Sequence, residues 1–187
     1  APGLGADVTI LDRNPDVLES VGTHFETRAK TRFSNKANIA ECVAEADLVI
    51  GAVLIPGAEA PKLVTRDMLK TMRPGSVLCD VAIDQGGCFE TSKATTHENP
   101  TYVVDDIVHY CVANMPGAVS RTSTYALNNV TLPHALAIAN KGWEVALRED
   151  KHLAEGLNVW NGHVTYKAVA EDLGYDYLSA AEILGLK

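Results

Sequence analysis

Asp80-Val81-Ala82-Ile83-Asp84-Gln85-Gly86-Gly87-Cys88-Phe89-Glu90 is the stretch that decides the fold of this chain. It overlaps an apolar run, residues 76–83, that predicts a buried strand. We expect the strand to stop at Asp84, where a carboxylate is followed by two glycines that let the backbone approach a ligand closely. In an open parallel α/β sheet, ligands lie beyond the carboxyl ends of the strands. An ordinary Asp-Gly-Gly turn explains the segment taken alone, and the rest of the chain favours a ligand site.

Composition and charge exclude several classes of function. The 187 residues are 47% apolar and 21% charged, which is typical of a globular protein with a sizeable core. The net charge of −8, without a basic cluster, argues against a nucleic-acid partner. No apolar run approaches the ~20 residues that a membrane-spanning helix needs. The cysteines have no metal-binding spacing and indicate reduced thiols of a cytoplasmic protein, with no metal site: Cys42, Cys79, Cys88 and Cys111.

Strands alternate with helices through the first half of the chain. Strands are predicted over residues 6–12, 27–33 and 47–54, and the last of these is the clearest buried strand. Helices are expected between them, over residues 14–22, 34–46 and 65–70. Asn14 and Pro15 suit a helix N-terminus, and Gly22 is expected to end that helix. This alternation predicts a parallel, doubly wound sheet with Ser34, Val53, Leu54 and residues 81–84 along one rim.

The second half begins with two further strand candidates and then becomes helical. The strands are expected over residues 102–104 and 108–113, and the second leads into Asn114-Met115-Pro116-Gly117. A long helix is predicted over residues 122–141, with a kink or a break at Pro133. Ser179 and Glu182 have the spacing of a capping box for a last helix.

One motif of the dinucleotide-binding fold is missing. A Rossmann half opens with a strand and a Gly-x-Gly-x-x-Gly loop that binds the pyrophosphate, and this chain has neither. In the strand order 3-2-1-4-5-6 that first strand is central, so the strands at 6–12 and 47–54 would lack a neighbour between them. Each unpaired group on a buried edge costs roughly 1–3 kcal/mol. We therefore expect a fragment that depends on preceding residues, the missing amino-terminal half.

Asp12 is a candidate cofactor ligand. An acid at the end of a strand in this fold accepts hydrogen bonds from the adenosine ribose hydroxyls. Arg13 follows it directly, and an adjacent arginine could accept the 2′-phosphate of NADP. NAD is the expected cofactor, and NADP stays open.

Four segments carry a resemblance to a known family. Val-Ala-Ile-Asp-Gln-Gly-Gly-Cys-Phe-Glu at 81–90 closely resembles the signature of alanine dehydrogenases. Residues 46–57, Tyr-Cys-Val-Ala-Asn-Met-Pro-Gly at 110–117 and Thr-Ser-Thr-Tyr-Ala-Leu at 122–127 are similar to other parts of that family. The resemblance implies that residues 1–118 are a partial NAD-binding Rossmann domain. Residues 119–187 would be a long connecting helix and the carboxyl-terminal part of the substrate domain.

The resemblance also implies an activity. The family oxidises L-alanine reversibly with NAD to pyruvate and ammonium, as a cytoplasmic homo-oligomer, commonly a hexamer, in amino-acid catabolism. Its catalytic histidine and lysine and its substrate-binding arginine lie in the amino-terminal half, so no histidine of this chain inherits such a role. We expect no membrane partner and no activity from residues 1–187 alone.

Site residues follow from the same resemblance. Asp84 matches the catalytic aspartate, and Asn114 lies where substrate and nicotinamide meet. The cofactor-binding residues carried over are Asp12, Ser34, Val53, Leu54, Val81, Ala82, Ile83, Asp84, Lys93, Val112, Ala113, Asn114 and Met115. Lys93 stands where relatives often have arginine. Simpler interpretations remain beside these: a helix cap for Ser34, core packing for Val53, Leu54 and Met115, and an inert thiol for Cys88.

Three alternatives to an alanine dehydrogenase remain. The NAD(H)-binding subunit of proton-translocating transhydrogenase resembles this family but typically has Glu-Gln-Gly-Gly where this chain has Asp84-Gln85-Gly86-Gly87. A saccharopine dehydrogenase-like relative is disfavoured by residues 84–90. The third alternative is a structural or binding fragment.

Overall fold

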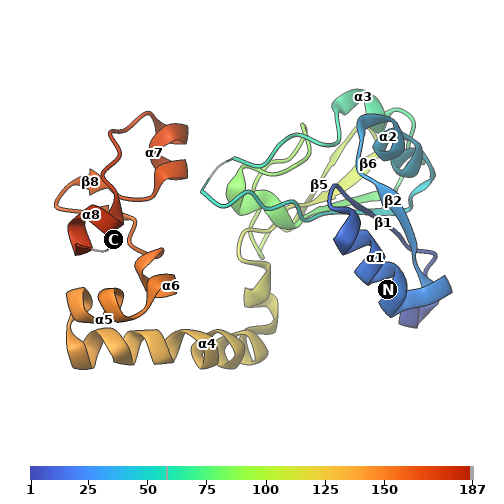
Figure 1. Cartoon of the computed structure of the whole chain (residues 1–187). Coiled ribbons are helices and arrows are strands. Elements are labelled where there is room, and N and C mark those ends of the chain that lie inside the picture. Colours follow the sequence, from blue (N-terminus) through green and yellow to red (C-terminus); the bar gives the residue numbers. More distant parts are fainter. Residues whose placement is uncertain (58, 186–187) are drawn as a thin grey trace. The chain divides into compact units, whose positions relative to one another are not determined.

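The computed structural model describes residues 1–57 and 59–185, which divide into two compact units (Figure 1). The first unit contains Ala1–Val53 and Ala60–Ala113. The second contains Leu54–Glu59 and Asn114–Lys187. Each unit is described by itself below.

The first unit alternates strands with helices, as the sequence predicts. Its strands are β1 (Thr9–Asp12), β2 (Lys30–Phe33), β3 (Leu48–Gly51), β4 (Val77–Asp80), β5 (Thr101–Val104) and β6 (Ile107–Tyr110). Its helices are α1 (Pro15–Phe25), α2 (Lys36–Glu45), α3 (Arg66–Leu69) and the short 3-10 helices η1 (Pro2–Leu4), η2 (Glu26–Arg28) and η3 (Val81–Gln85).

The strands form two separate sheets. β1 pairs in parallel with β2, and the second sheet has the order β3-β4-β6-β5. β3, β4 and β6 are parallel, whereas β5 is antiparallel to β6. Within the described residues no strand joins β1 to β3. Two pieces separated in this way are the strands 3-2 and 4-5-6 of the order 3-2-1-4-5-6, so the unit has the Rossmann-type doubly wound fold without its first strand.

Helix caps explain why α1 and α2 begin where they do. The Asn14 side chain accepts a hydrogen bond from the Asp16 amide, and Pro15 occupies the first turn. Asn35 caps α2 by accepting from the Asn38 amide at 2.8 Å. The prediction that Gly22 ends the first helix is wrong. α1 continues to Phe25, because Gly22 lies inside the helix and Glu26 takes up the positive φ instead.

The strand predicted over residues 76–83 ends earlier than expected. β4 stops at Asp80, and residues 81–85 turn into η3. The Asp80 side chain accepts a hydrogen bond from the Ala82 amide at 3.1 Å, which draws the chain into the helical turn. The acid that terminates the strand is therefore Asp80 and not Asp84.

The prediction of a well-buried strand at 47–54 is also corrected. β3 spans only Leu48–Gly51, and the side chains of Leu48 and Ile50 are 54% and 58% exposed. The reason is that Leu48 and Ile50 lie on one face of β3, which is exposed, whereas Val49 on the opposite face packs against the core. These two apolar side chains therefore remain exposed to solvent.

The strands at 101–110 form a hairpin that the sequence analysis did not foresee. Asp105 and Asp106 both have positive φ, 50° and 62°, and form its two-residue turn. β6 ends at Tyr110, three residues before the predicted end at 113. β5 therefore adds an antiparallel edge to a parallel sheet.

The core of the first unit lies against the second sheet. Its largest fully buried apolar side chains come from β4, α3, β6 and the loop after η3: Leu78, Leu69, Ile107 and Phe89. α2 contributes Val43, with Ile39 and Ala40 packed against the cluster. The loop after η3 thus belongs to the core and is anchored by it.

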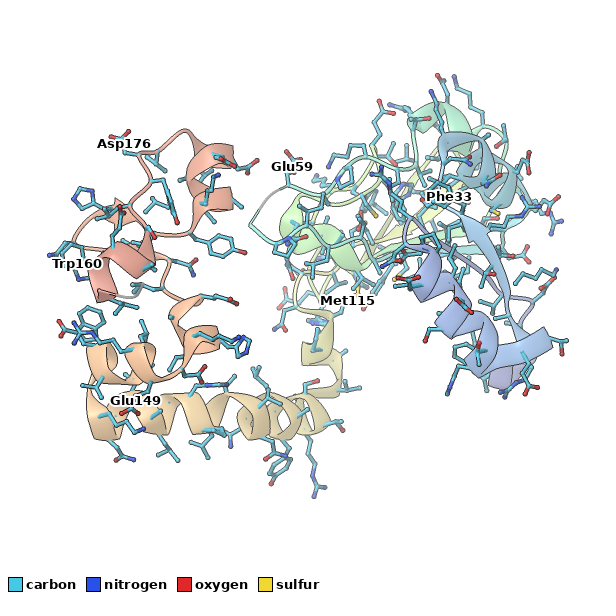
Figure 2. The ribbon with its side chains drawn as sticks, in the orientation of Figure 1. Phe33, Glu59, Met115, Glu149, Trp160 and Asp176 are labelled. Carbon is cyan, nitrogen blue, oxygen red and sulfur yellow. The ribbon has the colours of Figure 1, made fainter. Side chains whose placement is uncertain are left out.

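The second unit is largely helical. It contains η4 (Met115–Val119), α4 (Ser120–Lys141), α5 (Trp143–Glu149), α6 (Lys151–Ala154), α7 (Lys167–Leu173), α8 (Ala180–Leu184) and the strands β7 (Val159–Trp160) and β8 (His163–Val164). Ala146, Leu147, Ala154 and Leu184 form its small core. Figure 2 labels Trp160 and Met115 in this unit and Phe33 at the end of β2.

Two predictions about the second unit have clear outcomes. α4 passes through Pro133 without interruption, so the predicted break is absent. The capping box is confirmed, because Ser179 accepts from the Ala181 amide while Glu182 accepts from the Ser179 amide. Among the described residues, no helix is long and apolar enough to cross a membrane.

Candidate cofactor and substrate site

The predicted site residues of the first unit follow the carboxyl ends of its strands. Asp12 ends β1 and Ser34 follows β2. Because β3, β4 and β6 run in parallel, the residues after them share one edge of the second sheet. That edge carries the predicted residues Val53, Val81, Ala82, Ile83, Asp84, Val112 and Ala113.

Asp12 and Ser34 are direct neighbours. The parallel register pairs Asp12 with Phe33, and the Ser34 amide donates to the Asp12 carbonyl at 2.8 Å. Asp12 is half-buried, and its Oδ1 accepts from the Asn14 amide at 2.8 Å. The simpler interpretation of Ser34 as the helix cap is wrong, since Asn35 fills that role. The backbones of these two residues are therefore adjacent at the carboxyl end of the first sheet.

η3 alternates between exposed and buried side chains. Val81 and Asp84 are exposed, whereas Ala82 and Ile83 are buried. The helix is anchored through its buried side, and Asp84 projects from the anchored element at the carboxyl end of β4. This arrangement presents one carboxylate on a fixed backbone.

Asp80 is the buried residue that the sequence analysis passed over. Its side chain is fully buried and accepts hydrogen bonds from the Ala82 amide at 3.1 Å and the Cys88 amide at 2.9 Å. The Ser92 hydroxyl also donates to it in a short contact. The sequence contains a signal for this role, since Asp80 lies within the apolar run 76–83. A carboxylate buried in such a run needs hydrogen-bond donors around it.

Cys88 is an inert thiol in this setting. Burial, with a further contribution from the Asp80 carboxylate, raises the pKa of Cys88 to about 12. A thiol with such a pKa holds almost no thiolate near neutral pH, so it is a poor nucleophile. All four cysteines are free.

The segment after Glu90 is held by a polar network on the hairpin. The Lys93 amide donates to the Tyr102 hydroxyl at 2.7 Å, and that hydroxyl donates to the Thr91 carbonyl at 2.8 Å. The Lys93 side chain is exposed. Val112 is fully buried and Ala113 exposed, and the Ala113 amide donates to the Thr95 carbonyl at 3.1 Å.

Three predicted residues belong to the second unit. Leu54 is 70% exposed, and Met115 begins η4 as a half-buried residue. Asn114 has a left-handed backbone with φ 58°, a conformation that asparagine tolerates better than most residues. Backbone outliers of this kind gather at functional sites. The core interpretation does not fit the exposed Leu54, whereas half-buried Val53 packs against the core of the first unit.

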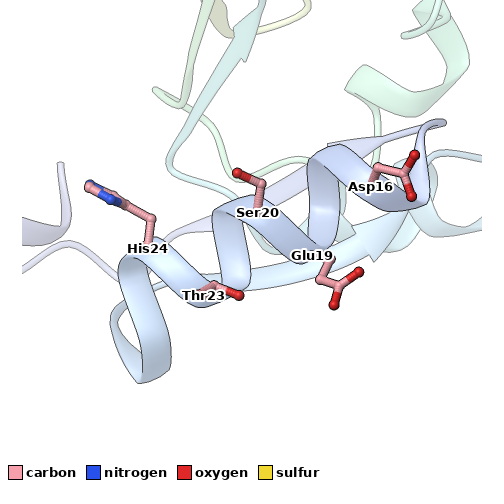
Figure 3. A pocket seen from close by; sticks show the side chains of 5 residues that line it. All are labelled: Asp16, Glu19, Ser20, Thr23 and His24. Carbon is pink, nitrogen blue, oxygen red and sulfur yellow. The ribbon is translucent and has the colours of Figure 1, made fainter.

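A shallow hollow on the outer surface of α1 is lined by five polar side chains, Asp16, Glu19, Ser20, Thr23 and His24 (Figure 3). All five are exposed and come from successive turns of one helix. Among the described residues, no cluster of His, Cys, Asp or Glu could hold a metal ion.

Fold and strand ends together place this chain in the class of Rossmann-type, doubly wound α/β proteins. The chain belongs to the family described as "Alanine dehydrogenase/PNT, C-terminal domain", whose model matches residues 1–167.

Individual relatives agree with this assignment. The chain is 62% identical to an alanine dehydrogenase of Halomonas elongata over 185 residues and 61% identical to one of Bacillus subtilis. These matches cover 99% and 98% of the chain but 50% and 49% of the relatives. The chain therefore spans about half the length of the curated relatives it matches.

Two solved structures that resemble the chain differ in how similar they are to it. An L-alanine dehydrogenase matches 92% of the chain with a TM-score of 0.80 and 50% identity, and 47% of that structure is covered. A transhydrogenase from Sinorhizobium meliloti matches 89% with a TM-score of 0.63 and 31% identity, and 44% of it is covered. The alanine dehydrogenase is the more similar of the two in both fold and sequence.

Proposed function

We propose that the complete polypeptide that carries this chain is an NAD-dependent L-alanine dehydrogenase. It would oxidise L-alanine reversibly to pyruvate and ammonium. The observation that carries the proposal is the 81–90 segment, which presents Asp84 at the carboxyl end of β4 in a chain 62% identical to an alanine dehydrogenase.

The residues of the first unit fit NAD in part. Asp12, at the end of β1, would accept hydrogen bonds from the adenosine ribose hydroxyls, and Ser34, whose amide donates to the Asp12 carbonyl, would lie near the adenine. Exposed Val81 and Ala113 and half-buried Val53 would supply apolar surface along the second sheet, whereas the buried residues Ala82, Ile83 and Val112 would contribute through their backbone. The exposed Lys93 would contribute a positive charge to the phosphate groups. The described residues do not include a glycine-rich pyrophosphate loop.

Asp84 is the proposed catalytic residue. When bound, NAD takes up the hydride that leaves the alanine α-carbon, which is chemistry that no side chain supplies. The Asp84 carboxylate stabilises the cationic iminium form of the substrate and accepts a proton from the water that attacks it. Asn114 would position the substrate, with Leu54 and Met115 beside it.

Removal of the Asp84 charge tests the role directly. Asp84→Asn in the complete polypeptide is expected to lower kcat for alanine oxidation by about 10²–10⁴, the usual range for a general acid–base group. The readout is alanine-dependent NADH formation, followed by absorbance. Asp67→Asn, at an exposed position of α3, is the control and should leave the rate unchanged.

A rate for Asp84→Asn within about twofold of the parent would remove Asp84 from the mechanism. An inactive parent with alanine would end the proposal itself. We expect residues 1–187 alone to be inactive in the same assay, since the histidine, lysine and arginine implied by the family are not assigned within them.

The proposal extends to location and assembly. Four free cysteines suit a reducing compartment, which supports a cytoplasmic enzyme. The resemblance supports a homo-oligomer, commonly a hexamer. The net charge of −8 and the absence of a spanning helix among the described residues fit an enzyme whose partners are small molecules.

A further inference from the structure

We infer that Asp80 and Lys62 form a two-sided clamp on residues 82–89 that fixes Asp84 in its working position. Both are then positioning residues for hydride transfer, and this inference rests on the proposed alanine dehydrogenase function. Neither residue is among those carried over from the family resemblance.

Asp80 holds the amide side of the segment. Besides the Ala82 and Cys88 amides, its carboxylate accepts from the Phe89 amide at 3.4 Å. The Ser92 hydroxyl donates to it, and the Cys88 sulfur lies 3.5 Å from Oδ1. A single buried carboxylate thus gathers donors from both sides of Asp84 in the sequence.

Lys62 holds the carbonyl side. Its Nζ donates to the Gly86 carbonyl at 2.6 Å and to the Gly87 carbonyl at 2.7 Å. Backbone bonds place it there, because the Ala60 amide donates to Gln85 at 2.8 Å and the Leu63 amide to Cys88 at 2.7 Å. The Gly87 carbonyl and the Cys88 amide belong to one peptide group. The Lys62 ammonium therefore binds its oxygen while the Asp80 carboxylate binds its N–H.

The glycines show how tightly this segment is held. Gly86 and Gly87 have φ of 84° and 75°, a region that other residues rarely adopt. A Cβ on Gly87 would lie 2.7 Å from the Asp80 Oδ2 atom and 2.7 Å from the Ser92 Cβ. Backbone, carboxylate and hydroxyl therefore share a space with no room for a methyl group.

The clamp acts on both flanks of an exposed catalytic group. Ala82 precedes Asp84 by two residues and Gly86 follows it by two, and both are held while Asp84 remains exposed. An alternative is that Asp80 and Lys62 stabilise the domain as a whole and have no particular effect at Asp84. The clamp predicts a loss of affinity that depends on the nicotinamide ring. General stabilisation of the domain predicts an equal loss for all parts of NAD.

ADP-ribose and NADH separate these interpretations, because ADP-ribose has every part of NAD except the nicotinamide ring, the part proposed to lie beside Asp84. The variants are Asp80→Asn and Lys62→Met in the complete polypeptide. Lys62 is exposed, so Lys62→Met keeps the test valid if Asp80→Asn does not fold. Lys70→Met is the matched control. That exposed lysine forms an ion pair with the exposed Asp67 and lies outside the clamp.

We expect both clamp variants to weaken NADH binding by about tenfold and to lower kcat at saturating alanine by about tenfold or more. ADP-ribose affinity should stay within about twofold of the parent in every variant. Hydrogen exchange of the Cys88 and Phe89 amides should accelerate in Asp80→Asn and Lys62→Met but not in Lys70→Met.

Equal losses of ADP-ribose and NADH affinity would overturn the clamp, and so would unchanged kcat and NADH affinity in Lys62→Met. A parent that binds NADH but does not oxidise alanine would instead overturn the proposed function. In that case the NADH to ADP-ribose ratio and the exchange of the two amides still decide whether the clamp exists.

Discussion

Asp80 and Asp84 lie four residues apart and have opposite environments. Asp80, the last residue of β4, is fully buried among amides and a hydroxyl, while Asp84 is exposed in η3, the element that follows. The buried acid keeps the backbone in one conformation so that the exposed acid has a fixed position. The chain changes from strand β4 to the 3-10 helix η3 between these two residues, so one acid is buried and the other is exposed.

Gly51 is the other residue on which this packing depends. It lies at the end of β3, where a Cβ would meet the Cys88 sulfur at 2.2 Å and the Phe89 ring at 2.7 Å. Gly51→Ala is expected to lower the free energy of unfolding by about 1–3 kcal/mol, because it overpacks a buried contact. Thermal and urea unfolding of the complete polypeptide measure the change.

Gly22→Ala is the matched control for that substitution. Gly22 lies inside α1 with nothing within 4 Å of its added Cβ, so alanine should stabilise by about 0.5–1 kcal/mol. Gly51→Ala as stable as the parent would mean that Cys88 and Phe89 do not pack on β3 as described.

At the scale of an element, the β5–β6 hairpin depends on a buried histidine. Of the six histidines, His109 alone is buried; its Nδ1 faces the Ile107 carbonyl at 2.9 Å and its Nε2 the Thr91 hydroxyl at 2.7 Å. Its ring stacks on Tyr102 with centroids 4.9 Å apart. A neutral ring that donates through Nδ1 and accepts through Nε2 satisfies both contacts.

The hairpin should therefore weaken in acid. Burial lowers the pKa of His109 below its usual value of about 6.5, despite the Ile107 carbonyl and the nearby Asp105 and Asp80. The unfolded chain then binds a proton before the folded one, so stability is complete above about pH 6.5 and is lost as the pH falls below it. Urea unfolding between pH 7 and pH 5 measures this loss.

His109→Gln should reduce that pH dependence, while His163→Gln, at an exposed position, should leave it unchanged. An identical slope in the parent and in His109→Gln would show that His109 does not titrate differently on folding.

Two helix starts of this chain could be predicted more closely than its strand ends. Asn14 and Ser179 act locally, so their caps follow from sequence, whereas Asn35 caps α2 in place of Ser34. The end of β4 depends on Asp80 meeting Cys88 and Ser92, which are eight and twelve residues away. Local patterns contain no such contact, and the strand was therefore predicted too long.

At the scale of the whole molecule, the parallel pairing of the first strands was predictable, whereas the antiparallel β5 and the exposure of β3 were not. The missing first strand explains the two separate sheets. Apolar periodicity identified β3 but could not show that Leu48 and Ile50 would lie on an uncovered face. The apolar pattern shows which side chains favour burial, but whether they are buried depends on the elements that pack against the strand.

The candidate site was predictable only as a set of strand ends. Parallel strands place Asp12, Ser34, Val53 and Asp84 after carboxyl ends, as expected. The resemblance added Asn114 and Met115, which lie in the other unit. Lys62 was missed because its contacts are with carbonyls more than twenty residues away.

A crystal structure of the complete polypeptide with NAD bound tests the central claim most directly. We expect the Asp12 carboxylate within hydrogen-bond distance of the adenosine ribose hydroxyls, with the Asp84 carboxylate beside the nicotinamide ring. A nicotinamide ring bound away from Asp84, with Asp12 facing only solvent, would contradict it.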